Sequence, residues 1–327
     1  MELKNNKLKD GLIIDHIEKC CDEITSRLQR DVLHELNRRG GVVGLSGGID
    51  SSVTLALAVR ALGAGNVTGI MLPEKDSSPE SLRLAKLLAS QYGVQTIVED
   101  LTDALEGLGC YKRRDEAIGR VIPDFDPRTD KAKIVLNQNI DPHIPSVFSV
   151  VTISPDGRKQ SKLLPAREYL QIVAATNFKQ RCRMAMLYYH AERLHYAVIG
   201  TPNKHEVEQG FFVKYGDGGA DVMPIGGLFK TQVYQMAEFL GVPQEIIDRT
   251  PTTDTYTAEQ TQEEFFYQLP FSTMDIIWHA WENQVPASDT AREVGRPENE
   301  IQSIYNNFER KKKTTSYLRM APIFYRF

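Results

Sequence analysis

Apolar residues recur along residues 11–39 at spacings of mostly three and four, which is the period of an amphipathic helix. Beyond this stretch, short apolar runs at 42–45, 67–72, 94–99 and 196–200 predict buried strands. The stretches 51–63 and 77–93 lie between the first three runs and predict helices. Short strands that alternate with helices form right-handed β-α-β units. The pattern therefore predicts an α/β fold with a parallel sheet that helices cover on both faces.

This pattern breaks down between Cys110 and Pro165, where prolines and mixed charges replace the periodic spacing. The letters "PDGR" at 155–158 predict a hairpin within this region. We interpret residues from about 112 to 165 as an insertion. The helical pattern resumes at 167–194, and a helical C-terminal region is expected over about 255–327. With no internal repeats, residues 1–327 are expected to form a single domain.

Composition and charge narrow the class of protein. The chain has 327 residues, of which 41% are hydrophobic and 25% charged, as in soluble globular proteins. Its net charge of −4 gives no general attraction to nucleic acid or to anionic membranes. No run approaches the roughly 18 apolar residues of a membrane span, and the N-terminus does not resemble a signal peptide. We expect a cytoplasmic protein whose four cysteines are free thiols, because they show no C-x-x-C spacing.

The loop at 46–52, which reads Ser-Gly-Gly-x-Asp-Ser-Ser, follows the first strand and opens the next helix. A helix N-terminus presents backbone N–H groups and a positive dipole end, and glycines let the chain wrap closely around an anion. Serine hydroxyls add further donors for phosphate. An acidic residue would repel phosphate unless a divalent cation lay between them, so Asp50 is a candidate Mg²⁺ ligand. The loop therefore predicts a site for phosphate and a metal ion.

Two other phosphate-binding motifs are excluded at this loop. The Walker pattern needs a lysine after its last glycine, and the dinucleotide pattern needs glycines spaced as G-x-G-x-x-G. Neither arrangement is present at 41–52.

A second group of polar residues lies further along the chain. The letters "NFKQRCRM" at 177–184 place three basic residues within a turn and a half of helix. The stretch 200–243 then combines an acidic residue, an aromatic pair, the letters "KYGDGGAD" and a lysine at the start of a predicted helix. Carboxylates between glycines can accept hydrogen bonds from hydroxyls or amides, and the neighbouring lysine can bind a phosphate.

These two regions together resemble a known family. The loop is similar to the pyrophosphate loop of the ATP-pyrophosphatase, or PP-loop, superfamily, and "GFFVKYGDGGAD" with "PIGGLFKTQVY" resembles NAD synthetases. The similarity runs from about 41 to 242, apart from the insertion. It implies a doubly wound, adenine nucleotide α-hydrolase-like (Rossmann-like) sheet. It also implies a ligase that adenylates the carboxylate of deamido-NAD with Mg-ATP. Free ammonia then displaces AMP, and pyrophosphate is the other product.

The resemblance also implies roles for individual residues. Those expected to bind ATP are Ser46, Gly47, Gly48, Asp50, Ser51, Ser52, Arg181, Thr201, Lys230 and Thr252. Those expected to line the deamido-NAD site are Asn177, Phe211, Lys214, Asp217 and Asp221. Asp50 and Glu206 would bind Mg²⁺. The catalytic roles fall to Asp50, Lys230 and Thr252, because Mg²⁺ and Lys230 can neutralise the charge that develops on pyrophosphate.

Two departures from the family pattern leave the acceptor open. Phe265 and Phe266 stand where the family has a smaller, flexible segment, and the insertion could cover the acceptor. An amide ligase of the same scaffold that acts on another carboxylate, on a sugar nucleotide or a secondary metabolite, is therefore the alternative. The ammonia is expected to be free or to come from a separate glutaminase. The family resemblance also implies a homodimer.

A different class of function is suggested by residues 288–313, which read as a helix-turn-helix followed by basic residues and are compatible with DNA binding. A helical hairpin that packs on a core gives the same pattern. Because the net charge is acidic, we favour packing and expect no nucleic-acid partner. Trp278 and Trp281, three residues apart on a predicted helix, are expected in packing or at a dimer surface.

Overall fold

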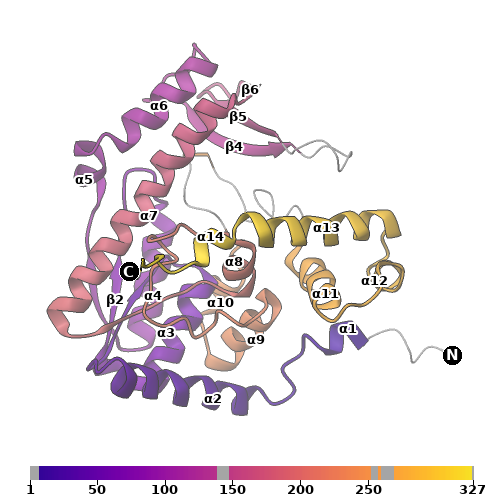
Figure 1. The fold of residues 1–327 in the computed structure, drawn as a ribbon. Helices are drawn as coiled ribbons and strands as arrows, with labels where there is room; N and C mark the ends of the chain where they lie inside the picture. Colours follow the sequence, from indigo (N-terminus) through magenta and orange to yellow (C-terminus); the bar gives the residue numbers. More distant parts are fainter. Residues whose placement is uncertain (1–6, 138–146, 252–256, 259–268, 326–327) are drawn as a thin grey trace.

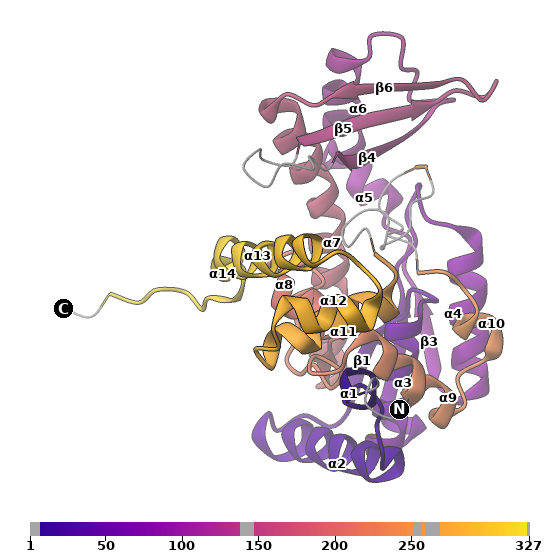
Figure 2. The same cartoon turned by 90° about the vertical axis from the view of Figure 1, so that its right-hand side faces the viewer.

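The computed structural model describes residues 7–137, 147–251, 257–258 and 269–325. Figures 1 and 2 show a parallel sheet with its helices, a smaller antiparallel sheet, and a group of C-terminal helices. The long helix α7 (Ala166–Leu194) runs from the small sheet to the parallel one. Thr252, Phe265 and Phe266 lie outside the described residues.

The parallel sheet has the strand order β3-β2-β1-β7. Its strands are β1 (Gly41–Gly44), β2 (Val67–Met71), β3 (Gln95–Val98) and β7 (Ala197–Ile199). All of its pairings are parallel, as the apolar runs predict. The chain proceeds outward from β1 to β3 and then returns to β7 on the other side of β1. This reversal makes a doubly wound sheet, and in such sheets ligands bind outside the carboxyl ends of the strands where the order reverses.

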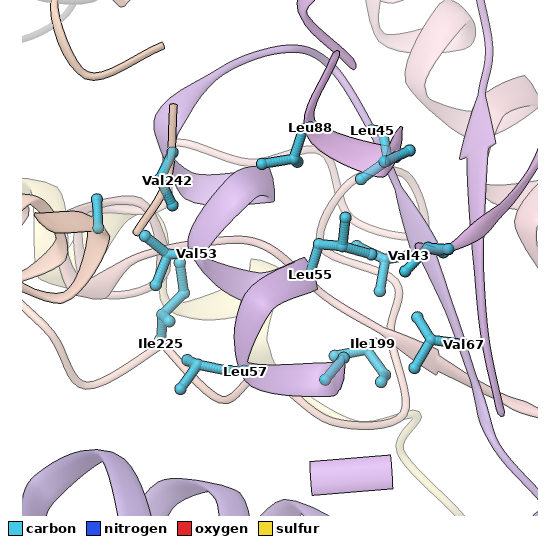
Figure 3. Close-up of a cluster of buried hydrophobic side chains, with 14 of the residues drawn as sticks. Val43, Leu45, Val53, Leu55, Leu57, Val67, Leu88, Ile199, Ile225 and Val242 are labelled. Atoms are coloured by element: carbon cyan, nitrogen blue, oxygen red, sulfur yellow. The ribbon is translucent and has the colours of Figure 1, made fainter. Parts of the chain in front are cut away.

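Helices cover both faces of this sheet, because alternate strand residues point to opposite sides. Val43 and Ile199 belong to one apolar cluster, which Figure 3 shows around Leu55. The helices of that face are α2 (Ile17–Arg30), α3 (Ile49–Leu62), α4 (Pro79–Gln91), α9 (Lys230–Leu240) and α10 (Gln244–Ile247). Val42 and Val198 point the other way, toward α7. The prediction that helices cover both faces of the sheet is confirmed, but the edge strand β3 is mostly exposed rather than buried.

Three short elements connect or extend these helices. The predicted helix over 11–39 is shorter in the structure: α2 ends at Arg30 and continues as the π-helical turn η1 (Asp31–Glu35). The 3-10 turn η2 (Ala64–Asn66) leads into β2. Helix α5 (Thr102–Gly107) follows β3.

The inserted region is more regular than the sequence pattern indicates. It contains α6 (Cys110–Val121) and an antiparallel sheet of β4 (Lys131–Asn137), β5 (Val147–Ile153) and β6 (Lys159–Leu163), in the order β4-β5-β6. The predicted hairpin connects β5 to β6, with Gly157 at a φ of 82°. Ile134, Val150 and Ile172 share a buried core with α6.

The expectation that the pattern breaks down from Cys110 onward is wrong for α6. Its buried positions are Cys110, Tyr111, Arg114, Ala117 and Ile118, which follow the helical period. Arg114 is charged but buried. A search for apolar periodicity therefore misses one position of the buried face of this helix.

A second core holds the helices of the C-terminal region. These are α11 (Phe271–Glu282), α12 (Ala287–Val294), α13 (Glu298–Thr314) and α14 (Ser316–Arg319), with α1 (Lys7–Asp10) and α8 (Lys204–Gln209) beside them. Trp278 is fully buried, with its ring centroid 4.5 Å from that of Phe308 and 5.2 Å from that of Trp281. Ile301 and Tyr305 of α13 are buried in the same cluster. The apolar face of the predicted helix-turn-helix therefore packs against α11.

A buried polar pair joins these C-terminal helices to the rest of the protein. His205 Nε2 of α8 and Asp275 Oδ1 of α11 are in hydrogen-bond contact, and both side chains are fully buried. The other carboxylate oxygen of Asp275 accepts the Thr231 N–H at 2.7 Å, in the first turn of α9. Asp275 thus holds α8 and α9, which both reach the site described below.

We expect Asp275→Asn to lower the free energy of unfolding by about 3 kcal/mol, because an amide replaces one of two buried acceptor oxygens and leaves a buried donor unpaired. Urea unfolding followed by circular dichroism measures the change. Asp289→Asn is the matched control, since its partner Arg292 is largely exposed, and it should cost less than about 0.5 kcal/mol. Equal stability losses in the two variants would contradict a structural role for Asp275.

Candidate active site

A pocket of about 280 Å³ opens at the carboxyl ends of β1, β2 and β7, where the strand order reverses. The loop after β1 contributes one wall. The predicted site residues that line the pocket are Ser46, Gly48, Asp50, Ser51, Thr201, Glu206 and Asp217. Apolar side chains such as Met71, Leu187 and Ile199 form another part of its wall.

The Ser/Gly loop enters α3 through Gly48, which is the N-cap residue of that helix. The loop is braced by its own serines: Ser51 Oγ lies 3.2 Å from Ser46 Oγ, and Ser52 Oγ donates to the Gly48 carbonyl at 2.8 Å. Ser52 is fully buried and does not line the pocket. The first N–H groups of an α-helix have no partner within the helix, so this loop presents donors to the pocket.

Gly47 has a geometry that only glycine fits. Its φ is +73°, and a Cβ at this position would lie 2.4 Å from the backbone oxygen of Ser81. The loop therefore packs directly against the first turn of α4.

Three charged side chains meet beside this loop. Lys230, the first residue of α9, is fully buried, and its Nζ lies 2.5 Å from Asp50 Oδ2. Asn203 connects the third member: its Nδ2 donates to Asp50 Oδ1 at 3.2 Å, and its backbone N–H donates to Glu206 Oε2 at 2.9 Å. Residues from β1–α3, α8 and α9 thus converge on one point.

Burial and mutual charge shift the pKa values in this cluster. Burial raises the pKa of the Glu206 carboxyl to about 8, with a further contribution from the charge of Asp50 and an opposing one from Lys230. For Lys230, burial acts to lower the pKa, but Asp50 and Glu206 outweigh it and hold the pKa above its ordinary value. At neutral pH Lys230 is therefore charged and Glu206 largely protonated.

The other predicted residues lie outside the pocket lining. Arg181 is exposed and donates from Nε to the Lys214 carbonyl at 3.3 Å. Lys214 Nζ donates to the carbonyls of Tyr317 and Met320 at 2.9 and 2.8 Å, so the C-terminal segment already holds it. Asn177 lies half-buried on α7.

The remaining acceptor-side residues are partly engaged in structural contacts. Asp221 accepts the Val198 N–H at 2.8 Å and the Tyr188 hydroxyl at 3.1 Å. Phe211 packs against the C-terminal core. Asp217 accepts the Val213 N–H at 2.7 Å while it lines the pocket.

The pocket is also lined by two arginines that were not among the predicted site residues. Arg249 donates to Ser81 Oγ at 3.0 Å and to the Gly47 carbonyl at 3.4 Å, which places a cation beside the Ser/Gly loop. Arg183 lies on α7, and its Nε donates to the Leu72 carbonyl at 3.3 Å. Arg183 belongs to the basic letters at 177–184, so spacing alone could have proposed it. A single arginine such as Arg249 carries no local motif.

The sequence of this chain is similar to those of known proteins over nearly its full length. The family model described as NAD synthase matches residues 20–118 and 129–317 of the chain. The chain belongs to the NAD synthase family. An NH3-dependent NAD(+) synthetase of Rhizobium meliloti (strain 1021) is 47% identical over 313 residues, which are 96% of this chain and 93% of that protein.

Solved structures of similar fold agree with the membership in the NAD synthase family. An NMN synthetase from Francisella tularensis has a TM-score of 0.64 at 21% identity, over 95% of this chain and 99% of that one. An NH3-dependent NAD synthetase from Campylobacter jejuni subsp. jejuni NCTC 11168 has a TM-score of 0.61 at 19% identity, over the same shares of the two chains. At such identities the likeness concerns the fold, which is the predicted doubly wound one.

Three further features bear on the sequence expectations. Among the described residues, no helix is long and apolar enough to cross a membrane. All four cysteines are free thiols, as predicted. Within the same part of the chain, no group of three or more His, Cys, Asp and Glu side chains is arranged to hold a metal ion.

We expect Gly47→Ala to destabilise the protein by at least about 2 kcal/mol, because the methyl group combines a strained φ with a collision against backbone. Gly241→Ala is the control: its φ is +78°, but a Cβ there would meet open space. It should lose only about 1 kcal/mol. If the two substitutions gave the same unfolding midpoint in urea, the close packing of the loop on α4 would be refuted.

The raised pKa of Glu206 predicts a stability that falls as pH rises. In the unfolded chain this carboxyl ionises near 4.5, whereas in the folded protein it holds its proton to about 8. Between these values the folded state binds the extra proton, so ionisation favours unfolding. Glu206→Gln should therefore be more stable than the parent at pH 7.5, by on the order of 1 kcal/mol, and the gain should shrink toward pH 5.

Thermal unfolding from pH 5 to pH 8 measures this trend. Glu208→Gln is the control, because Glu208 pairs with Lys204 at 2.9 Å and its removal should give no stabilisation at pH 7.5. A loss of stability in Glu206→Gln at pH 7.5 would show that the carboxyl is not held protonated.

Proposed function

We propose that this protein is an ammonia-dependent NAD synthetase. In this reaction a carboxylate oxygen of deamido-NAD attacks the α-phosphorus of ATP and pyrophosphate leaves. Ammonia then attacks the activated carbonyl carbon, and AMP departs with the former carboxylate oxygen. The observation that carries the proposal is the buried Lys230 beside Asp50 and the Ser/Gly loop, at the switch point of an NAD synthase fold.

The loop would bind the β- and γ-phosphates through backbone N–H groups and through the hydroxyls of Ser46 and Ser51. Lys230 keeps its charge and would neutralise the negative charge that grows on departing pyrophosphate. Arg249, which donates to the Gly47 carbonyl of the loop, would add a second cation. We infer that these groups act by position and electrostatics, and that no side chain forms a covalent bond with the substrate.

The same cluster suits Mg²⁺, which binds through one or two carboxylates together with substrate phosphates and water. Asn203 donates to Asp50 Oδ1 at 3.2 Å and to Glu206 Oε2 at 2.9 Å, which holds the two carboxyl groups near each other. Such a pair needs a cation between its members when both are ionised. We propose Asp50 and Glu206 as the ligands, and the bound ion would neutralise charge on the ATP phosphates. Thr252 is proposed to act near the same phosphates.

The acceptor would extend from the pocket past Asp217 toward the C-terminal segment. We propose that the deamido-NAD site includes the residues named by the family resemblance, namely Asn177, Phe211, Lys214, Asp217 and Asp221. Arg181 and Thr201 would contact the ATP. We also propose that the protein is a homodimer and that it is cytoplasmic. A separate glutaminase would be one source of its ammonia.

Purified protein with ATP, Mg²⁺, ammonium and deamido-NAD should form NAD and release one pyrophosphate per NAD. Nicotinate mononucleotide should react poorly in a parallel assay, which tests the acceptor. The Francisella tularensis neighbour is named an NMN synthetase, so a preference for the mononucleotide is a definite alternative outcome. Pyrophosphate release with neither acceptor would point to a different carboxylate and overturn the proposal.

Asp50→Asn should lower kcat/KM at least 100-fold, because it removes a charge that pairs with Lys230 and a proposed metal ligand. Coupled measurement of pyrophosphate and NAD follows the loss. Asp22→Asn is the control, since Asp22 pairs with Arg60 on the protein surface. Near-normal turnover in Asp50→Asn would remove the basis for the metal role.

A further inference from the structure

The inserted module, residues 110–137 and 147–172, contacts two segments that border the pocket. The first is the loop after β2, residues 73–78, whose Ser77 and Ser78 line the pocket. The second is the pair Thr257 and Ala258, which follows the pocket-lining residues Thr250 and Pro251 in the sequence.

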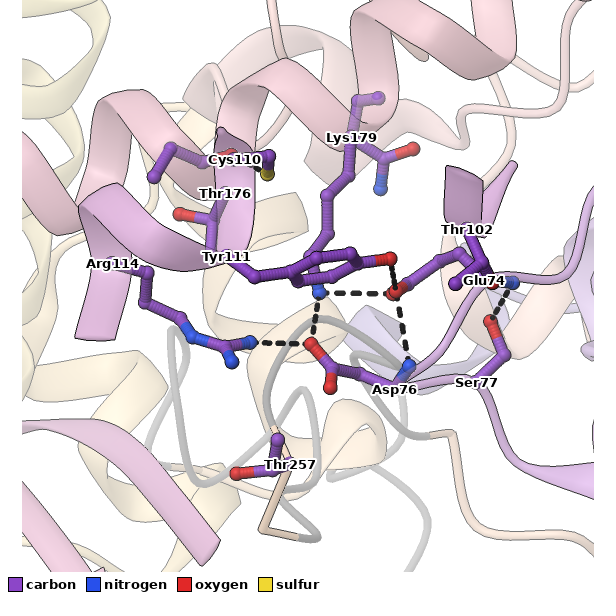
Figure 4. A network of polar contacts seen from close by, with 12 residues as sticks. Glu74, Asp76, Ser77, Thr102, Cys110, Tyr111, Arg114, Thr176, Lys179 and Thr257 are labelled. Carbon is purple, nitrogen blue, oxygen red and sulfur yellow. Dashed lines mark hydrogen bonds and ion pairs between the residues drawn. The ribbon is translucent and has the colours of Figure 1, made fainter. Parts of the chain in front are cut away.

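The first contact is a buried network of charges, drawn in Figure 4. Lys179 Nζ lies 2.9 Å from Glu74 Oε1 and 2.5 Å from Asp76 Oδ2. From the inserted module, Tyr111 donates its hydroxyl to Glu74 Oε2 at 2.7 Å, and Arg114 pairs with Asp76.

Every member of this network is shielded from solvent. The side chains of Glu74, Asp76 and Lys179 are at most 4% exposed, and that of Arg114 is 8% exposed. Burial acts to raise the pKa of Asp76, but the charges of Lys179 and Arg114 hold it below its ordinary value. Movement of the loop relative to α6 would leave buried charges without partners, which is costly. The network therefore fixes the loop against the module.

Hydrogen bonds within the loop 73–78, and one contact to an arginine of the pocket wall, connect Glu74 to the pocket. Ser77 Oγ accepts the Glu74 N–H at 3.0 Å, and the Asp76 N–H donates to Glu74 Oε2 at 3.0 Å. Arg183, which lines the pocket, has its Nη2 3.8 Å from Glu74 Oε1. Glu74 thus connects Tyr111 of the module to a wall of the site.

The second contact is made by the edge strand of the inserted sheet. Thr257 Oγ1 accepts the Ala132 N–H of β4 at 2.6 Å and lies 3.3 Å from the Ala132 carbonyl, to which it donates. The Ala258 N–H donates to the same carbonyl at 3.2 Å, and Ala258 is buried. Thr257 follows Pro251 by six residues, so it lies within about 20 Å of the pocket lining by chain length alone.

We infer that the inserted module is a positioning element of the active site, which holds the loop 73–78 through Tyr111 and Arg114 and holds Thr257 and Ala258 through the backbone of Ala132. Thr257 and Tyr111 are positioning residues, because each acts on the ATP pocket through another segment. The inference rests on the proposed function, because the KM values that test it are those of the NAD synthetase reaction.

Thr257→Val tests the second contact, since valine keeps the shape of the threonine side chain and removes both hydrogen bonds that the Thr257 hydroxyl makes with Ala132. We expect the KM and the dissociation constant for ATP to rise about fivefold to tenfold, while the KM for deamido-NAD stays within twofold. Thr257→Ser should restore the ATP values, because it keeps the hydroxyl. Thr129→Val, at an exposed threonine of the module, should match the parent.

Tyr111→Phe tests the first contact independently, because it removes only the bond to Glu74. The same selective weakening of ATP binding is expected. Circular dichroism and urea unfolding identify any variant that fails to fold, in which case the other variant decides. Folded Thr257→Val and Tyr111→Phe proteins that both bind ATP as the parent does would overturn the inference.

A direct measurement of ATP binding separates this inference from the proposed function. If the parent binds ATP but forms no NAD, the proposed reaction fails, while the comparison of ATP dissociation constants still tests the module. If the parent forms NAD and the variants bind ATP normally, the module has no positioning role.

Discussion

The buried ion pair between Lys230 and Asp50 is the interaction on which the rest of the site depends. A lysine in the first turn of a helix opposes the helix dipole, and its full burial removes the water that would solvate the charge. Asp50 offsets both costs, and it can do so only because α3 and α9 pack side by side on one face of the sheet. The fold thus brings a cation to the Ser/Gly loop that no local segment could place there.

The same constraint explains why the pair is unsuited to a purely structural role. Buried ion pairs add little net stability compared with apolar residues of similar size, and Glu206 beside this one loses its charge at neutral pH. Burying Lys230, Asp50 and Glu206 together costs solvation free energy. Phosphate would bind the cation, and a metal ion would bind the carboxylates, so the costs become binding energy.

Much of the fold could be predicted from the sequence, because the central strands β1, β2 and β7 are largely buried and leave clear apolar runs. The loop at 46–52 was equally readable, since its glycines and acidic residue form one local motif. Arg249 and the network around Glu74 could not be found in this way. Their partners lie far apart in the chain, at Ser81 and Lys179, and only packing brings them together. Arg114 also obscured α6, because a charged residue occupies one of its buried positions.

The central claim is that this NAD synthase family member activates a carboxylate as an adenylate beside Lys230. It is tested most directly by isotope transfer from deamido-NAD labelled with ¹⁸O in both carboxylate oxygens. After one turnover with ATP and ammonia, mass spectrometry should find one ¹⁸O in AMP and one in the amide of NAD. Label in pyrophosphate, or none in AMP, would contradict adenylation and the role given to the pocket.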